Sequence, residues 1–348
     1  MKTGKILLIM FLGMCPVRIS FSGGGTDMPE YYNEFGGNVV TTAIDHFTYV
    51  ILNLRNDDLI QTFSSDFQMH NPSTSFEKLE SKPGTEITIA ALKHLNFKTG
   101  ANVMVCSDVP SGSGLGGSSS LTVNFVKTLS TLNKLKWSNE KVAETSFDIE
   151  RNVLQHPIGK QDDYIASFGG FNFIQFTKER IHVEPIKINK STFDELQENL
   201  VLFFVGNIRK NTIILSSQLQ NLKEKRKETI ESLHYVKGLS EEMNSALKQS
   251  NITHFGELLH KGWLAKKKFA KGVSNEDIDK IYDVALENGA LGGKLTGAGG
   301  GGHMLFYCEK LKQDRLIEKM KDIGLKHVKF NFNTDGSKVL NLYDYSKE

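Results

Sequence analysis

Residues 105–120, Val-Cys-Ser-Asp-Val-Pro-Ser-Gly-Ser-Gly-Leu-Gly-Gly-Ser-Ser-Ser, form a glycine- and serine-rich stretch between a predicted strand and a predicted helix. Glycines let the backbone adopt positive φ and approach a ligand closely, and a helix that starts behind them offers unpaired N–H groups and the positive end of its dipole. The serines add hydroxyl groups for hydrogen bonds or for a magnesium ion. The stretch therefore predicts a loop that binds phosphate.

Two common nucleotide-binding motifs do not explain this loop. Residues 112–117 have the Gly-x-Gly-x-x-Gly spacing of the dinucleotide fingerprint, but that motif requires an acidic residue about 20 positions further on. None occurs between Asp108 and Glu140, which disfavours a nucleotide-dependent oxidoreductase. The P-loop motif requires a lysine after its last glycine, and Ser118 stands there instead. The sequence predicts a phosphate loop of a third kind.

The composition is that of a globular protein. At 348 residues the chain is longer than one core usually covers, which predicts two domains. A net charge of +2 gives no electrostatic basis for binding nucleic acid, and no apolar stretch is long enough to span a bilayer. The three cysteines lie far apart, which argues against a zinc site or a disulfide scaffold. We expect a cytoplasmic protein, either a monomer or a homodimer.

The first residues resemble a signal peptide only in part. Lys2 and Lys5 precede the apolar run Ile6–Leu12, as in such peptides. However, Met14 lacks the small side chain that cleavage prefers, and another apolar segment follows at once. Two alternatives stay open, namely an upstream start codon ahead of Met14 or an added first strand.

A second glycine-rich turn follows an early strand. The alternating segment Val17–Phe21 breaks at residues 22–27, Ser-Gly-Gly-Gly-Thr-Asp, and a short helix is predicted at Glu30–Glu34. Arg18 and Asp27 flank the glycines. A guanidinium beside a carboxylate suits a polyhydroxylated or phosphorylated ligand, although three glycines can also form a bare turn.

The remaining pattern predicts an α+β protein whose first domain ends near Phe176. Gly37–Leu54 reads as one or two strands with Asp45-His46 at the junction, where a hairpin turn explains the pair almost as well as a ligand contact. Residues 55–85 read as an irregular insertion or lid. Further strands are predicted at Ala101–Asp108, Phe171–Phe176, Ile181–Ile188, Leu200–Val205, Met304–Tyr307 and Val328–Phe332. Further helices are predicted at Ile87–Asn96, Leu121–Leu135, Ser138–Leu154, Thr212–Leu222, Lys223–Ser250, His254–Phe269, Glu276–Asn288 (after a cap at Ser274) and Asp314–Ile323.

Glu150 stands in line with an apolar stripe on its predicted helix. Ala143, Phe147 and Leu154 lie at helical spacing from it, so its carboxylate is expected to face the interior. Burial of a carboxylate is costly unless a cation or hydrogen-bond donors meet it. Spacing alone leaves two partners open: Arg151 or another basic side chain, and a metal ion.

Two adjacent aspartates, Asp162 and Asp163, follow near the start of another predicted helix. Either one can cap that helix. An aspartate in such a place can also act as the base that deprotonates an alcohol near a magnesium-bound nucleotide. Further on, residues 289–303 form another glycine-rich loop, which leads into a predicted buried strand.

Three motifs in this order resemble those of the GHMP kinases, which phosphorylate small molecules such as galactose, homoserine and mevalonate. They are residues 16–27, Pro-Val-Arg-Ile-Ser-Phe-Ser-Gly-Gly-Gly-Thr-Asp, residues 110–120 of the phosphate loop, and residues 294–302, Lys-Leu-Thr-Gly-Ala-Gly-Gly-Gly-Gly. The resemblance spans almost the whole chain from Cys15 on. Within the family, the first motif, Ala43–Asp45 and Gly206–Arg209 resemble the D-glycero-D-manno-heptose 7-phosphate kinase subgroup, although fucose kinases share related forms.

The resemblance implies a fold and an activity. The fold is the two-domain GHMP kinase fold, with a ribosomal-protein-S5-like domain at residues 1–176, which binds ATP and sugar, and a ferredoxin-like domain at residues 177–348. The activity is transfer of the γ-phosphoryl group of ATP, with Mg²⁺, to a sugar. In the heptose subgroup the acceptor is the anomeric hydroxyl of the 7-phosphate, and the 1,7-bisphosphate formed supplies nucleotide-activated heptose for surface polysaccharide. Alternatives are a fucose- or galactose-type kinase and a catalytically silent sugar sensor.

The resemblance also implies roles for individual residues. Asp162 takes the place of the catalytic aspartate, with Asp163 and Lys160 as neighbours, and Ser118 and Glu150 take the places of the magnesium ligands. The residues expected to face the sugar are Arg18, Gly24, Gly25, Thr26, Asp27, Asp45 and Gly170. The residues expected to bind ATP are Pro110, Ser111, Gly112, Ser113, Gly114, Leu115, Gly116, Gly117, Ser118 and Ser119. The third motif, which is expected to brace the phosphate loop, contributes Thr296, Gly297, Ala298, Gly299 and Gly300.

Two positions depart from the family pattern. Gly117 stands where many members have serine, so Ser119 is a competitor of Ser118 for the metal. His303 ends the third motif where cysteine or a bulky apolar residue is common, and we expect it to serve packing. Arg209 and Lys266 are candidates for binding a distal phosphate of the sugar.

Overall fold

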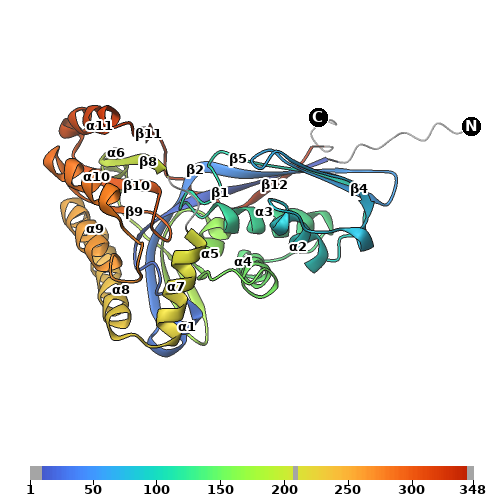
Figure 1. Cartoon of the computed structure of the whole chain (residues 1–348), viewed down its shortest axis with the longest axis horizontal. Coiled ribbons are helices and arrows are strands. Elements are labelled where there is room, and N and C mark those ends of the chain that lie inside the picture. Colours follow the sequence, from blue (N-terminus) through green and yellow to red (C-terminus); the bar gives the residue numbers. More distant parts are fainter. Residues whose placement is uncertain (1–9, 207–210, 343–348) are drawn as a thin grey trace, which may run out of the picture.

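Two β-sheets form the frame of the protein in a computed structural model that describes residues 10–206 and 211–342 (Figure 1). The eight strands of the larger sheet are β1 (Met10–Ser22), β2 (Gly37–Leu54), β3 (Leu59–Ser64), β4 (Met69–Ser75), β5 (Ala101–Ser107), β6 (Phe171–Phe176), β7 (Ile181–Pro185) and β12 (Lys338–Asn341). The four strands of the smaller sheet are β8 (Leu200–Gly206), β9 (Ala290–Leu295), β10 (Gly302–Cys308) and β11 (Lys326–Val328). The strand orders are β12-β1-β2-β5-β3-β4, with β6 beside β2 and β7 beside β6, and β11-β8-β10-β9.

Helices cover both sheets. The helices of the first half are α1 (Pro29–Phe35), α2 (Glu86–His94), α3 (Gly117–Leu132), α4 (Asn139–Asp148) and α5 (Gln161–Phe168). Those of the second half are α6 (Lys190–Glu198), α7 (Asn211–Lys223), α8 (Lys227–Lys248), α9 (Ile252–Lys266), α10 (Glu276–Glu287) and α11 (Gln313–Asp322). α3 and α5 pack on β1 and β2, with α2 and α4 beside them, whereas α9 packs on the smaller sheet and α8 reaches from α9 to the larger one (Figure 1). In the part of the chain described here, no helix is long and apolar enough to cross a membrane.

β2 is one continuous strand of 18 residues rather than a hairpin. Its register with β1 jumps between Pro16 and Val17, which leaves Asp45 and His46 as extra residues in a bulge. The hairpin-turn interpretation of this pair is therefore wrong. The bulge lets one strand pair with β5 in its second half and with β6 in its first half.

The expected lid at residues 55–85 is instead part of the larger sheet. β3 runs parallel to β5 and antiparallel to β4. Its buried positions are Ile60, Thr62 and Ser64, so two of the three side chains on the buried face are polar. This polar content hides the period-two alternation that would otherwise have predicted a strand.

Other differences concern which strands pair across the sequence. Ile181–Ile188 is expected in the second domain, but β7 pairs with β6 in the larger sheet. Residues 289–303 are expected to form one loop, but they contain β9, and β12 was not expected at all. The side chain of Asn275, rather than Ser274, caps α10 by accepting a hydrogen bond from the backbone N–H of Ile278. The division into residues 1–176 and 177–348 stays a prediction, since β7 and β12 follow its boundary and yet belong to the larger sheet.

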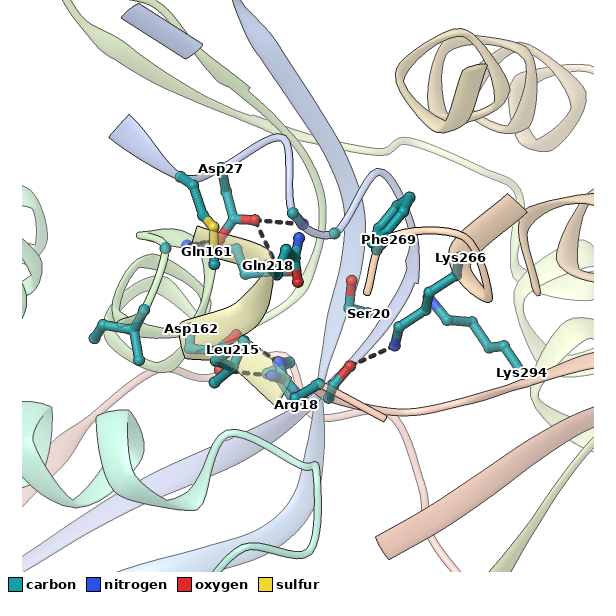
Figure 2. A pocket seen from close by; sticks show the side chains of 17 residues that line it. Arg18, Ser20, Asp27, Gln161, Asp162, Leu215, Gln218, Lys266, Phe269 and Lys294 are labelled. Carbon is teal, nitrogen blue, oxygen red and sulfur yellow. Dashed lines mark hydrogen bonds and ion pairs between the residues drawn. The ribbon is translucent and has the colours of Figure 1, made fainter. Parts of the chain in front are cut away.

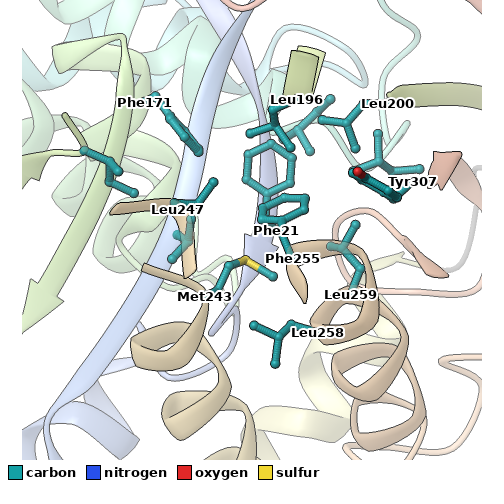
Figure 3. Packing of buried hydrophobic residues seen from close by; sticks show 14 of the residues in the cluster. Phe21, Phe171, Leu196, Leu200, Met243, Leu247, Phe255, Leu258, Leu259 and Tyr307 are labelled. Atoms are coloured by element: carbon teal, nitrogen blue, oxygen red, sulfur yellow. The ribbon is translucent and has the colours of Figure 1, made fainter. Parts of the chain in front are cut away.

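One hydrophobic cluster joins the two sheets (Figure 3). Val17, Ile19 and Phe21 of β1 pack there with Leu202 of β8 and with side chains from β10, α8 and α9. Phe255 of α9 is fully buried, and its ring lies edge-on to that of Phe21 with centroids 5.1 Å apart. The arrangement fixes β1, which carries part of the site described below, against the smaller sheet.

Phe255→Ala should lower the free energy of unfolding by about 3–5 kcal/mol, because it removes a buried ring and leaves a cavity at the junction of the sheets. Urea denaturation followed by circular dichroism measures the change. Tyr235→Ala on α8 is the control, because this side chain is 51% exposed and its loss should change stability by less than about 0.5 kcal/mol. Similar small effects of both substitutions would contradict the role of the shared cluster.

Candidate active site

A cavity lies between β1 of the larger sheet and β9 of the smaller sheet (Figure 2). Its wall combines the first glycine turn, the start of α5, one face of α7, the end of α9 and the third glycine motif. Arg18 and Asp162 lie on one side, Asp27 and Gln161 on another, and Lys266 and Lys294 come from the second half of the chain. Charged groups of both signs thus converge on one space.

Arg18 and Asp162 form the central ion pair of this cavity. The Arg18 guanidinium donates from Nε and Nη2 to the two carboxylate oxygens at 2.6 and 2.5 Å, and from Nη1 to the carbonyl oxygen of Gly114 at 2.7 Å. A bidentate arginine–carboxylate pair fixes both planar groups. Asp162 stands in the first turn of α5, where the helix dipole favours a negative charge. The Arg18 side chain is almost buried, whereas that of Asp162 remains 22% exposed.

The phosphate loop leads directly into α3. Gly112, Gly114 and Gly116 all have positive φ, between 73° and 81°, and Gly116 precedes α3 in the left-handed conformation. No side chain caps the first turn of α3. The first N–H groups of the helix are therefore open to an anion, as the sequence predicts.

The third motif contacts the phosphate loop closely. A Cβ atom on Gly297 would lie 2.5 Å from the Cα atom of Gly114, and one on Gly302 would lie 2.4 Å from the carbonyl oxygen of Ser113. His303 is buried, and its Nδ1 lies 2.9 Å from the same Ser113 oxygen, so its N–H donates to the loop. Burial lowers the pKa of His303 and favours the neutral ring. His303 thus adds a hydrogen bond to the packing role that we expected.

Ser118 and Glu150 meet at the start of α3. The Ser118 hydroxyl donates to Oε2 of Glu150 at 2.6 Å, and Glu150 is fully buried. Within the described residues, its Oε1 has no hydrogen-bond partner. Arg151 instead bonds Glu30, which excludes it as the partner of Glu150, whereas the ring of another basic residue, His156, has its Nδ1 3.4 Å from Oε2 of Glu150. Ser119 is buried as well and makes no such contact, so the structure favours Ser118 over it.

A turn of π-helix, Ile149–Val153, carries Glu150. Such turns insert an extra residue into an α-helix and often occur at functional sites. The expected helix therefore changes its geometry where the carboxylate enters the site, after α4 has begun at the predicted cap, Ser138.

The Ser118–Glu150 pair fits a magnesium ion. Mg²⁺ prefers oxygen ligands, and in phosphate-transferring sites it takes one or two carboxylates together with substrate phosphates and water. Glu150 offers one unpartnered oxygen beside the phosphate loop, and Ser118 offers a hydroxyl. Across residues 10–206 and 211–342, no group of three or more His, Cys, Asp or Glu side chains is arranged to hold a metal. A metal at this site therefore depends on phosphate oxygens for its remaining ligands.

Asp163 and Lys160 have other partners. Asp163 is fully buried and accepts a hydrogen bond from the Ser146 hydroxyl at 2.6 Å. Burial and then the negative charge of Glu150 raise the pKa of Asp163 well above its usual range. Lys160 binds both carboxylate oxygens of Glu144 at 2.7 Å. Neither residue lines the cavity.

Asp27 ties the first glycine turn to α5. Its carboxylate accepts from the backbone N–H groups of Gly25 and Gln161 and from Nε2 of Gln161, at 2.8, 3.1 and 3.0 Å. Burial, followed by repulsion from Asp162, raises the pKa of Asp27. Asp27 lines the cavity, but its oxygens already have donors from the protein.

Not every expected sugar-facing residue reaches the cavity. Those that line it are Arg18, Gly24, Gly25 and Asp27. Thr26 is buried behind the turn, where its hydroxyl bonds the carbonyl oxygens of Gly23 and Asn38. The Asp45 carboxylate binds the backbone and side chain of Asn331, and Gly170 pairs with the backbone of Ala43 and Asn333. These three residues support neighbouring segments. Arg209 lies outside the described residues.

The sequence did not point to several polar groups of the cavity wall. Oγ of Ser20, Oε1 of Gln161 and Nε2 of Gln218 are buried and have no hydrogen-bond partner in the described part of the chain. Ser20 stands two residues after Arg18 on β1, so period-two alternation places both on one face and could have identified it. Gln218 of α7 carries no comparable signal, whereas Lys294 of β9 is the first residue of the third motif and was given no role of its own.

Comparisons with known proteins agree with this geometry. Residues 86–170 match the family model of the GHMP kinases N terminal domain, and residues 243–325 match that of the GHMP kinases C terminal. Over 333 residues the chain is 32% identical to the D-glycero-alpha-D-manno-heptose 7-phosphate kinase of Campylobacter jejuni, covering 93% of this chain and 96% of that protein. The chain belongs to the GHMP kinases. It is thus a phosphotransferase with an alcohol group as acceptor, and ATP is the phosphoryl donor of this family.

Solved structures of GHMP kinases share the fold. A D-glycero-D-manno-heptose 1-phosphate kinase from Bacteroides thetaiotaomicron superposes with a TM-score of 0.79 at 25% identity, covering 95% of this chain and 99% of that one. The mevalonate kinase of Methanococcus jannaschii superposes with a TM-score of 0.71 at 19% identity, covering 92% and 98%. These comparisons confirm the predicted α+β class and GHMP kinase fold.

Asp162→Asn should lower kcat by about 100-fold or more, on the scale of a lost general base, because an amide cannot accept the proton of the acceptor hydroxyl. ATP affinity should change little, since the phosphate loop is intact. The rate of ADP release measures kcat, and titration calorimetry measures the affinity for ATP. Asp163→Asn is the matched control, because the raised pKa favours a neutral carboxyl that an amide resembles in shape. Near-normal turnover of Asp162→Asn would contradict the assignment.

Proposed function

We propose that this GHMP kinase transfers the γ-phosphoryl group of ATP to the anomeric hydroxyl of a heptose 7-phosphate and forms the 1,7-bisphosphate. The observation that carries the proposal is the Arg18–Asp162 pair, which faces the cavity while Arg18 also bonds Gly114 of the phosphate loop. A base for the acceptor hydroxyl and a loop for the donor phosphates are thus joined by one side chain.

The chemistry of the cavity supports a sugar as acceptor. The unpartnered polar atoms of Ser20, Gln161 and Gln218 can exchange hydrogen bonds with hydroxyl groups, and buried polar groups without partners are unfavourable until a ligand supplies them. Leu215 and Phe269 add apolar surface to the same wall. The relative from Campylobacter jejuni, whose name specifies heptose 7-phosphate, supports the choice of substrate.

In the proposed mechanism, Asp162 accepts the proton of the sugar hydroxyl. Arg18 occupies one lone pair on each carboxylate oxygen, and each oxygen keeps another for the substrate. Arg18 also brings positive charge to the point where the phosphoryl group passes, and the N–H groups at the start of α3 bind phosphate oxygens. Ser118 and Glu150 would hold Mg²⁺, which neutralises charge on the donor phosphates when it is bound.

A fucose-type kinase is the second candidate. The chain is 25% identical to L-fucokinase/L-fucose-1-P guanylyltransferase of Bacteroides fragilis over 84% of its length, although it spans only 34% of that protein. A silent sugar sensor is disfavoured because Asp162, Glu150 and Ser118 are all present. Arg18 joins Asp162 to the phosphate loop, and Glu150 bonds Ser118 directly behind that loop. We place the reaction in the cytoplasm, where ATP is available, and in the supply of nucleotide-activated heptose for surface polysaccharide.

A screen of acceptors tests the proposal. ATP consumption is measured with heptose 7-phosphate, mannose, fucose, galactose and mevalonate, and phosphorus NMR locates the new phosphate. We expect the highest kcat/KM with heptose 7-phosphate and a new phosphate on the anomeric oxygen. Preference for fucose would support the second candidate, and absence of turnover with every sugar would overturn the kinase proposal.

Glu150→Gln should raise the Mg²⁺ concentration that gives half-maximal rate by about 10-fold or more, since loss of even an outer-shell partner can weaken metal binding by that factor. The reason is that the amide offers one neutral oxygen in place of a carboxylate. Initial rates over a magnesium titration measure the effect. Glu140→Gln on α4 is the control, because Glu140 is exposed. An unchanged titration in Glu150→Gln would assign the carboxylate to structure alone.

A further inference from the structure

Lys266 places a positive charge in the cavity without a carboxylate partner. It ends α9 and lies outside the three glycine-rich motifs. Its ammonium donates to the carbonyl oxygens of Leu295, at 3.0 Å, and Gly297. In the part of the chain that the structure describes, no carboxylate oxygen lies within 4 Å of it, although the neighbouring Lys267 pairs with Asp279 at 2.8 Å.

The surroundings of Lys266 add positive charge rather than neutralise it. Lys294 lines the same cavity and is 6% exposed, and among the described residues it donates only to the carbonyl oxygen of Phe21, at 3.0 Å. Arg18 lines the same cavity, with Asp162 as its partner (Figure 2). Three basic side chains therefore line a cavity whose two acidic side chains, Asp162 and Asp27, already have donors from the protein, and this arrangement favours an anionic ligand.

The hydrogen bonds of Lys266 leave room for that ligand. An ammonium group has three N–H donors, and two of them bind Leu295 and Gly297. The two carbonyl groups fix Nζ beside the third motif, which itself contacts Gly114 of the phosphate loop. The third donor remains for a group inside the cavity.

We propose that Lys266 binds an oxygen of a phosphoryl group held in this cavity. The inference rests on the proposed function, because that function brings two phosphoryl groups to the cavity. One is the group in transfer from ATP, and the other is the phosphate that the sugar already carries. Both offer the same anionic oxygens, and the substrate comparison below separates them.

The protonation of Lys266 gives the site a pH dependence. Burial, followed by repulsion from Arg18, lowers the pKa of Lys266 to about 7, and attraction to Asp162 opposes the shift. Burial, followed by repulsion from Lys266 and Arg18, lowers the pKa of the neighbouring Lys294 well below its usual range. Because the ammonium is charged below its pKa and neutral above it, anion binding should weaken as the pH rises through about 7.

Lys266→Met tests the proposal, because it keeps the length of the side chain and removes the charge. We expect kcat/KM to fall about 10- to 100-fold, the range of one lost hydrogen bond to a charged group. The Tm should change little, because removal of a half-buried unpaired charge is stabilising whereas the carbonyl groups of Leu295 and Gly297 lose a donor. Lys268→Met, exposed and two residues further on, should change neither quantity.

Two acceptors separate the sources of the phosphoryl group. If Lys266 binds the phosphate of the sugar, the loss appears in KM for heptose 7-phosphate and not for the unphosphorylated heptose. If Lys266 binds the group in transfer, kcat falls with both. A change below about threefold with both sugars overturns the proposal. Lys266→Gln repeats the test with a neutral side chain that can still donate to the two carbonyl groups. Full recovery of kcat/KM in this variant also overturns the proposal, because a structural role of Lys266 then explains the loss.

Sulfate binding tests the inference without turnover. Sulfate keeps its charge over this range, so its effect on the Tm of the wild-type protein should be larger about one pH unit below 7 than one unit above it. In Lys266→Met, the effect of sulfate on the Tm should be the same at the two pH values, and the general stabilisation that sulfate gives to proteins should remain. If no sugar is phosphorylated and the difference depends on Lys266, only the proposed function fails. If sugars are phosphorylated and Lys266→Met behaves as the wild type, only the inference fails.

Discussion

The bidentate contact between Arg18 and Asp162 is the interaction on which the arrangement of the site depends. It joins β1 to the start of α5, and the third hydrogen bond of the same guanidinium reaches Gly114 of the phosphate loop. Three segments that are far apart in the sequence thereby take one relative position. The shared hydrophobic cluster around Phe21 and Phe255 then fixes β1 against the smaller sheet. The second half of the chain is thereby also held in a fixed position relative to the ion pair.

The site is left electrostatically incomplete by the protein alone. Glu150 is buried with one unpartnered oxygen, and within the described residues the half-buried Lys266 and the buried Lys294 bond only carbonyl groups. Such groups reduce stability unless opposite charge reaches them. A kinase complex supplies it from outside, since a magnesium ion can meet the carboxylate and phosphate oxygens can meet the ammonium groups. Buried charges without partners are therefore consistent with a function that depends on ligands.

The sequence predicted the parts of this protein that local rules determine. The glycine loop before α3, the cap at Ser138 and the buried position of Glu150 follow from backbone freedom, side-chain capping and helical spacing. Long-range pairing did not follow: β7 and β12 join the larger sheet through partners that no local pattern specifies. Polar buried positions such as Thr62 also concealed β3. For the same reason, the residues of α7 that reach the cavity, Leu215 and Gln218, were not identified in advance.

The two halves of the chain contribute differently to the cavity. Arg18, Ser118, Glu150 and Asp162, to which we assign the phosphoryl transfer, all belong to the first half of the chain. The opposite wall comes from α7, the end of α9 and β9, and its polar groups lie mostly outside the three glycine-rich motifs. A reaction that a whole family shares requires the same geometry of the reacting groups in every member. Discrimination between acceptors instead requires contacts that differ from one member to another, and the opposite wall can supply these. Acceptor choice in this kinase should therefore be determined mainly by the wall that the second half of the chain supplies.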